Sequence, residues 1–235
     1  MFATDRSWPV FCLATAMVML PPLAAQGDAL PPLTQILDQH RKALGAERVL
    51  AASVPLLLKG RCDSTGDEES GPIEILVQSP KVVFDLNRGA LRMGYNGDSV
   101  WRSGAGEALQ QRKGRQFAEL VTVFDPARAR WWREWYPQMA VTGVRPVEKR
   151  DAFVLETVSG SPLTERLFID RQSGLLVRDE LAAQYTFTFS DYRAVNGVMT
   201  AFEVRETAPN GIVYNYHFES IAPVNEVDAS RFVPR

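Results

Sequence analysis

Apolar and polar residues alternate along the chain from Tyr185 to Phe218, which is the clearest pattern in the sequence. A period of two places one set of side chains on one face of a strand and the other set on the opposite face. Asn196-Gly197 and Pro209-Asn210-Gly211 interrupt the alternation with residues typical of tight turns. The segment therefore predicts a three-stranded antiparallel meander with one aromatic face. That face comprises Tyr185, Phe187, Phe189, Val198, Thr200, Phe202, Val204, Ile212, Tyr214, Tyr216 and Phe218.

The same alternation recurs upstream in shorter runs separated by turn residues such as Ser79-Pro80 and Asn96-Gly97. About ten strands in sequence, nearly all joined by short turns, predict one large antiparallel sheet that curls. The strands upstream of the meander are expected at 54–63, 73–77, 82–86, 91–95, 100–101, 141–147, 152–158, 164–170 and 175–181.

Helical spacing appears in few places. It is clear at 33–44, where Leu33, Ile36 and His40 recur before Gly45, and it returns at 117–124. Asp125-Pro126 then predicts an N-cap and first turn for a helix that ends before Pro137. The fold class is therefore mainly β (α+β), a single curled antiparallel sheet that forms an incomplete barrel covered by two or three helices.

The first 27 residues have the pattern of a secretory signal peptide, with Arg6 before an apolar run from Val10 to Leu20 and small residues at Ala24 and Ala25. The run is shorter than the roughly 20 residues of a membrane-spanning helix. Residues 1–27 are therefore expected to be a signal peptide, and residues 28–235 one domain without a transmembrane segment. The periplasm is the expected location.

The composition is that of an ordinary globular protein, with 46% hydrophobic and 23% charged residues. A formal net charge of -2 gives no bulk attraction to nucleic acid. After cleavage only Cys62 would be left, which excludes an intramolecular disulfide and predicts a small buried hydrophobic residue. We expect a monomer.

Whether the aromatic face packs solidly or lines a cavity is left open by the pattern, and a packed core is the usual outcome. The helix expected at 125–136 favours a cavity, because four of its aromatic residues fall on one broad stripe that would face the sheet. The candidate cavity residues are Phe84, Met93, Trp101, Trp131, Trp132, Trp135, Tyr136, Phe187, Phe189, Phe202, Tyr214 and Tyr216.

Three segments, Gly71 to Phe84, Met93 to Trp101 and Val227 to Phe232, resemble the outer-membrane lipoprotein-sorting (LolA/LolB-like) family. The family's order of helix, strands, lid helices and further strands spans the whole mature chain. The resemblance implies an unclosed antiparallel barrel with a helical lid and a hydrophobic cavity for lipoprotein acyl chains. LolA-type carriers place an arginine before the proline of the strand-turn motif, where it helps to latch the lid, and this chain has Ser79 there.

Signatures of catalysis are missing from the sequence. It contains no G-x-S-x-G elbow, phosphate-binding loop or C-x-x-C pair, and His40 and His217 are its only histidines. His217 is expected on the polar face of the last long strand. No enzyme activity, metal or cofactor is therefore expected.

Two functions follow. The first is an exported periplasmic binding protein that shelters the acyl chains of a lipoprotein or lipid without catalysis. The alternative is an envelope protein-interaction or scaffold domain with a filled core, no ligand and an envelope protein as partner.

Overall fold

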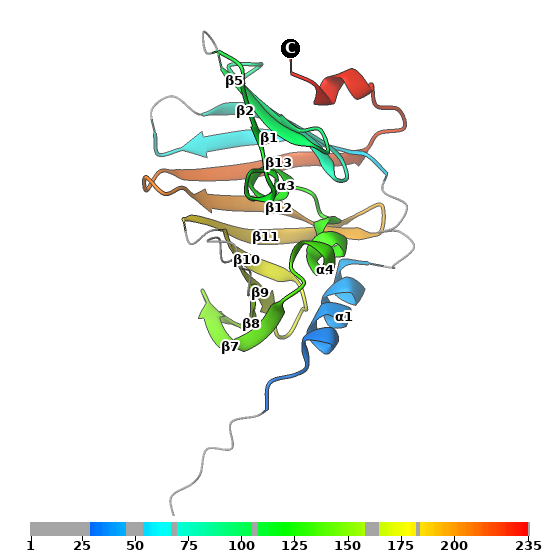
Figure 1. Ribbon diagram of the computed structural model, residues 1–235, viewed down its shortest axis with the longest axis vertical. Coiled ribbons are helices and arrows are strands. Elements are labelled where there is room, and N and C mark those ends of the chain that lie inside the picture. The colour runs from blue at the N-terminus through cyan, green and yellow to red at the C-terminus, as the bar shows by residue number, and fades with distance from the viewer. Residues whose placement is uncertain are drawn as a thin grey trace, which may run out of the picture.

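The computed structural model describes residues 29–45, 54–66, 70–104, 108–157, 165–181 and 184–234 (Figure 1). The expected signal peptide at 1–27 lies outside these residues, so its cleavage and export stay predictions. Within the described ranges, none of the helices has the length and apolar character needed to cross a membrane.

Thirteen strands of the described chain form a single antiparallel sheet that does not close into a barrel. Their order in the sheet is β6-β5-β4-β3-β2-β1-β13-β12-β11-β10-β9-β8-β7, so β1 pairs with β13 and joins the two halves of the chain. The predicted fold class is confirmed. The strands are β1 (Leu56–Ser64), β2 (Gly71–Gln78), β3 (Lys81–Leu86), β4 (Leu91–Tyr95), β5 (Ser99–Gly104), β6 (Gln110–Lys113), β7 (Met139–Val147), β8 (Arg150–Thr157), β9 (Arg166–Asp170), β10 (Leu176–Leu181), β11 (Tyr185–Val195), β12 (Val198–Thr207) and β13 (Val213–Pro223).

The predicted meander is β11, β12 and β13. Val195 pairs with Val198, so Asn196 and Gly197 alone make the turn, and both have the positive φ angles (48° and 79°) that such a hairpin needs. Phe187, Phe189, Phe202, Val204, Tyr216 and Phe218 are all buried on the predicted apolar face. The exposed imidazole of His217 lies 3.6 Å from Glu203, which confirms its predicted place on the polar face.

The helices cover one side of the curved sheet. In Figure 1, α3 (Arg115–Thr122) lies across the middle of the sheet, and α4 (Trp132–Trp135) lies beside α1 (Leu33–Leu44) at one end. The main hydrophobic core lies between these helices and the concave face, and it includes Ile36 of α1 and the predicted small residue Cys62. The helices therefore form the cover that the apolar face requires.

The convex face carries two smaller apolar clusters. Trp101, Leu76 and Val83 pack there under Phe232 of the short helix η2 (Ala229–Phe232), and the indole of Trp101 donates a 2.9 Å hydrogen bond to the Phe232 carbonyl oxygen. At the other end, Val154, Phe168 and Val177 belong to a second cluster. Strands β2, β3 and β8 contain consecutive apolar residues. Both of their faces are covered, the concave face by the main core and the convex face by one of these two clusters.

Two expectations about elements were wrong. Residues 110–113, which are not among the expected strands, form the edge strand β6, because Gln110 to Lys113 pair with Ser99 to Arg102. The helix expected at 125–136 is broken into a 3-10 helix, η1 (Arg128–Trp131), followed by the single turn of α4. A 3-10 helix has three residues per turn, so neighbouring tryptophans do not share the stripe of a continuous α-helix.

Candidate ligand cavity and its lid

A cavity of about 690 Å³ lies between the concave face of the sheet and α3. One wall comes from β3, β4 and β5, and the other comes from β11, β12 and β13. Its volume falls within the range of about 300–1,000 Å³ that ligand pockets commonly have. The lining residues are Gly66, Phe84, Leu86, Leu91, Met93, Arg102, Leu120, Phe124, Tyr185, Phe187, Glu206, Ala208, Pro209, Asn210, Ile212, Tyr214 and Tyr216.

An aromatic cluster forms the inner end of this cavity. The rings of Phe84, Phe124 and Tyr216 lie edge-on or tilted to one another with centroids 5.0–6.2 Å apart, and Tyr214 stacks on Tyr216. Such offset arrangements are the favourable ones for aromatic pairs. Part of the barrel interior is thus filled by rings, and the cavity occupies the space beside them.

The cavity reaches the surface near the turn between β12 and β13. Exposed Pro209 and Asn210 line it there, and Figure 1 shows this turn at the end of the sheet away from α1 and α4. Two charged residues, Arg102 and Glu206, also line it. The hydroxyl of Tyr216 donates a 2.7 Å hydrogen bond to Glu206 Oε2, and burial followed by this carboxylate raises the pKa of Tyr216 well above its ordinary value. The site is an apolar cavity with a few polar groups.

The structure brings five of the twelve candidate residues to this cavity. They are Phe84, Met93, Phe187, Tyr214 and Tyr216, and they come from both halves of the chain. The period-two pattern found them because inward-facing positions of neighbouring strands share one surface.

The other seven candidates lie elsewhere. Trp101 belongs to the convex face under η2. Phe202 is buried in the main core, where Tyr136 and Trp135 also pack. Trp132 and Phe189 line a separate void of only about 50 Å³ beneath η1 and α1. Trp131 lies beside Ser79 at the turn between β2 and β3. The three tryptophans of η1 and α4 do not line the larger cavity, and Figure 1 shows α4 at the other end of the sheet from its mouth.

Sequence reasoning did not nominate Tyr185, Arg102 and Glu206 as site residues. Tyr185 has the same parity as Phe187, which was a usable signal. Arg102 and Glu206 occupy positions of their strands that face inward. A charged residue at such a position normally indicates that the apolar face ends there, so the pattern did not identify them as site residues. Phe124 follows the end of α3, so its place depends on how the helix packs.

The lid segment after α3 is attached to the sheet at Ser79. Arg130 Nη2 donates to the Ser79 carbonyl oxygen and Trp131 Nε1 donates to its Oγ, each at 3.4 Å, which is long for a hydrogen bond. The guanidinium of Arg130 also lies 4.9 Å from the centre of the Trp131 indole. Ser79 thus accepts from two side chains of the segment that follows α3.

His40 of α1 is buried against the lid. Its ring stacks on Trp132 with centroids 5.0 Å apart, and its Nδ1 lies 2.8 Å from the Gly174 carbonyl oxygen, to which it donates. Burial lowers the pKa of His40 to about 4, the hydrogen bond opposes this shift, and the cation of Arg128 adds to it. The imidazole is thus neutral at pH 7 and serves as packing between α1, η1 and the sheet.

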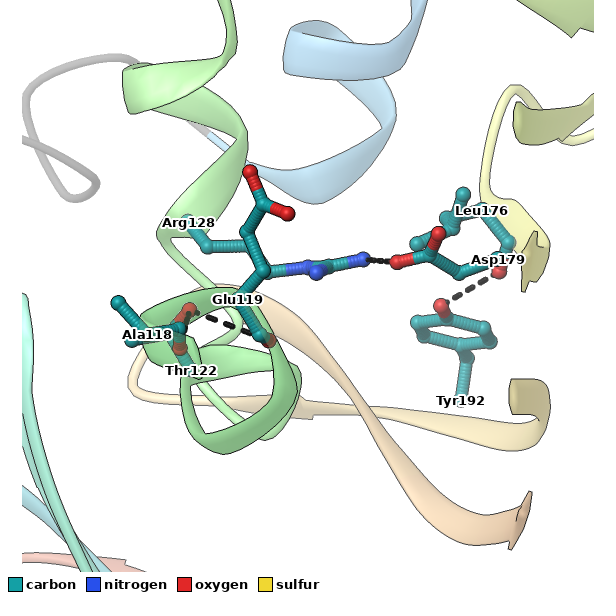
Figure 2. A network of polar contacts seen from close by, with 7 residues as sticks. All are labelled: Ala118, Glu119, Thr122, Arg128, Leu176, Asp179 and Tyr192. Atoms are coloured by element: carbon teal, nitrogen blue, oxygen red, sulfur yellow. Dashed lines mark hydrogen bonds and ion pairs between the residues drawn. The ribbon is translucent and has the colours of Figure 1, made fainter. Parts of the chain in front are cut away.

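Arg128 of η1 forms a buried ion pair with Asp179 of β10 (Figure 2). Their side chains are 5% and 0% exposed. Burial opposes the charge of Arg128, but Asp179, Glu165 and Glu119 together outweigh it and raise the pKa of the guanidinium. Figure 2 also shows Tyr192 donating to the Leu176 carbonyl oxygen, at 2.6 Å, beside this pair. This ion pair joins η1 to β10, whereas Arg130 and Trp131 join the same segment to Ser79 at the turn between β2 and β3.

Glu165 is a buried acid next to this ion pair. Its pKa is raised well above the ordinary value, first by burial and then by Asp179, while Arg128 acts in the opposite direction. Among the residues that the structure describes, neither carboxyl oxygen of Glu165 has a hydrogen-bond partner, and Asp179 Oδ1 has none either. Burial and the neighbouring carboxylate of Asp179 thus both favour the protonated form of Glu165.

Solved structures with the same architecture are known. No protein-family model matches the sequence, and no curated protein matches it. A DUF1329 family protein from Desulfovibrio piger superposes with a TM-score of 0.58 at 12% identity, covering 87% of this chain and 98% of that one. A LolA superfamily protein from Nitrosomonas europaea gives 0.54 at 11% identity, covering 87% and 99%.

A third structure, a Vibrio parahaemolyticus domain described as an outer membrane lipoprotein-sorting protein, gives a TM-score of 0.53 at 12% identity and covers 84% of this chain and 94% of that one. The protein therefore has a LolA-like fold, an open curled sheet with helices on its concave side. At these identities the likeness concerns the fold, and it confirms the resemblance found in the sequence at that level.

Proposed function

We propose that this protein is an exported carrier that shelters acyl chains of a lipid or lipoprotein in the cavity between β3–β5, β11–β13 and α3. The 690 Å³ cavity with its apolar and aromatic lining is the observation that carries the proposal. The LolA-like fold and the predicted signal peptide support it. The interior of a scaffold domain without a ligand would be close-packed throughout, so the cavity favours the carrier over that alternative.

Burial of apolar surface supplies the affinity. Each methylene transferred from water into the cavity contributes about 0.8 kcal/mol. Ten buried methylenes therefore contribute roughly 8 kcal/mol before the entropic cost of association is subtracted. The proposed action is binding and release without covalent chemistry, and an envelope protein that delivers or receives the ligand completes the proposal.

The first test is native mass spectrometry of the freshly purified mature protein, followed by organic extraction. A carrier retains lipid that appears as added mass and is recovered in the extract. The second test measures uptake of a fluorescent fatty acid by the delipidated protein. A bare mass together with no uptake would contradict the proposal.

A cavity-filling variant links uptake to this cavity. Met93 is partly exposed and lines it, so the indole in Met93→Trp enters the space that a ligand needs. Displacing even two methylenes costs about 1.6 kcal/mol, or more than about tenfold in affinity. Val144→Trp is the matched control, because Val144 is exposed on β7 and does not line the cavity. Equal uptake by both variants would place binding elsewhere.

A further inference from the structure

Two side chains of opposite charge line the proposed acyl cavity from opposite walls. Arg102 lies on β5 next to Trp101, whose indole points to the convex face, so the alternation of the strand directs Arg102 to the concave side. Its backbone partner on β4 is Met93, which pairs in turn with Phe84, and all three line the cavity. Arg102 thus places a charge next to the apolar pair of Phe84 and Met93.

Glu206 holds the corresponding place on the other wall. It pairs with Phe187 on β11 and with Tyr214 on β13, so a carboxylate lies in the middle of an inward-facing aromatic row. Its Oε2 accepts the Tyr216 hydroxyl at 2.7 Å. A carboxylate here weakens a purely apolar surface, and a packed core would not favour it.

The two charges act at one place. After burial, Glu206 raises the pKa of the Tyr185 phenol and Arg102 lowers it, so both side chains lie within electrostatic reach of this hydroxyl. Tyr185 lines the same cavity. Arg102 is exposed and Glu206 is partly exposed, which puts the pair toward solvent and the aromatic cluster at the inner end.

This arrangement matches an amphiphile with both charges in its head. A guanidinium binds phosphate or carboxylate oxygens through paired hydrogen bonds, and a carboxylate attracts an ammonium group. A head with only a negative charge meets repulsion from Glu206, and a head with only a positive charge meets repulsion from Arg102. Resting on the proposed carrier function, we propose that the ligand has a zwitterionic headgroup held at the cavity mouth between Arg102 and Glu206.

The test compares four amphiphiles that each have a single saturated chain of sixteen carbons and differ in the head. They are lysophosphatidylcholine (zwitterionic), lysophosphatidic acid (anionic), monopalmitoylglycerol (neutral) and hexadecylamine (cationic, with the same number of carbons). Each displaces the neutral dye N-phenyl-1-naphthylamine from delipidated protein below its micelle concentration. Lysophosphatidylcholine is expected to bind at least about fivefold more tightly than each of the others. A fivefold difference in affinity corresponds to about 1 kcal/mol, the contribution of one exposed ion pair.

Two variants report on the two charges separately. In Glu206→Gln the preference is expected to move to lysophosphatidic acid, and in Arg102→Gln to hexadecylamine. Arg61→Gln and Glu203→Gln are matched controls, because these exposed residues on β1 and β12 do not line the cavity, and they are expected to keep the preference of the unmodified protein.

The outcomes separate this inference from the proposed function. Tight binding of all four amphiphiles with equal affinity would overturn the headgroup inference and leave the carrier function standing. A preference of the unmodified protein for the anionic head, lost in Arg102→Gln, would replace the zwitterion with an anion. Failure of the dye and every amphiphile to bind would overturn both.

Discussion

Protonation of His40 is expected to destabilise the protein in acid. The imidazole is 2% exposed, donates to the Gly174 carbonyl oxygen and stacks on Trp132. A second proton on Nε2 would place a charge among apolar groups and near the cation of Arg128. The perturbation is therefore a change in pH, compared between the unmodified protein and His40→Asn. The asparagine amide can still donate to Gly174 but does not titrate.

The magnitude follows from the two pKa values. An ordinary histidine has a pKa of 6.5 and His40 has one of about 4, a difference of 6.5 − 4 = 2.5 units. At 1.36 kcal/mol per unit this is about 3.4 kcal/mol at most. Above pH 6.5 both states are neutral and His40 contributes no pH dependence. As the pH falls from 6.5 toward 4, only the unfolded chain takes the proton, so stability is lost, by about 2 kcal/mol at pH 5.

Urea denaturation followed by tryptophan fluorescence at pH 7, 6 and 5 measures this loss. His40→Asn is less stable at pH 7, because it lacks the ring stack, but the gap to the unmodified protein should narrow by about 2 kcal/mol at pH 5. His217→Asn is the matched control, because it makes the same substitution at an exposed histidine away from α1 and Trp132. A gap of constant size across this pH range would refute the reasoning.

Three further predictions concern the lid and its buried charges. Arg128→Met leaves Asp179 buried without its cation and should cost about 3–5 kcal/mol; urea denaturation at pH 7 checks this, and a loss no larger than the roughly 1 kcal/mol of an exposed ion pair contradicts it. Glu165 has a raised pKa, so its contribution to stability is complete below about pH 4.5 and is lost as the pH rises through the pKa of the folded state. Glu165→Gln should therefore remove this fall in the free energy of unfolding, measured by urea denaturation between pH 4.5 and 8. The same pH dependence in variant and unmodified protein contradicts the prediction. Trp132→Ala should cost about 3–5 kcal/mol in the same assay, with fatty-acid uptake by the folded fraction unchanged; lost uptake at normal stability would assign this tryptophan to the ligand.

Much of the fold could be predicted because strand periodicity is local. The parity of Phe187 and Tyr216 assigned each to the inward face, and Asn196-Gly197 located a hairpin turn, without knowledge of any distant residue. The same parity brought Phe84 and Met93 to the cavity wall. The overall curled sheet with helices on one side follows from the number of such strands and the scarcity of helical segments.

The arrangement of the lid could not be read in this way. A helical stripe across Trp131 and Trp132 assumes continuous α-helical geometry. The chain instead makes a turn in which Ala127 N–H donates to Asp125 Oδ1, and the 3-10 helix η1 follows from Arg128. Trp131 donates to Ser79, and Trp132 stacks on His40. These partners lie far away in sequence, and no local pattern specifies them.

Alternation assigns residues to two faces but does not say what covers each face. Trp101 has a fully buried ring, yet it belongs to the convex side because η2 from the C-terminal end packs there. Arg102 and Glu206 have inward parity in the sequence, and only the curvature of the sheet brings their strands to face one another across a space. The sequence determined which side chains point inward. Tertiary packing determined where rings fill the interior and where a cavity is left, because that depends on the distance between strands remote in the chain.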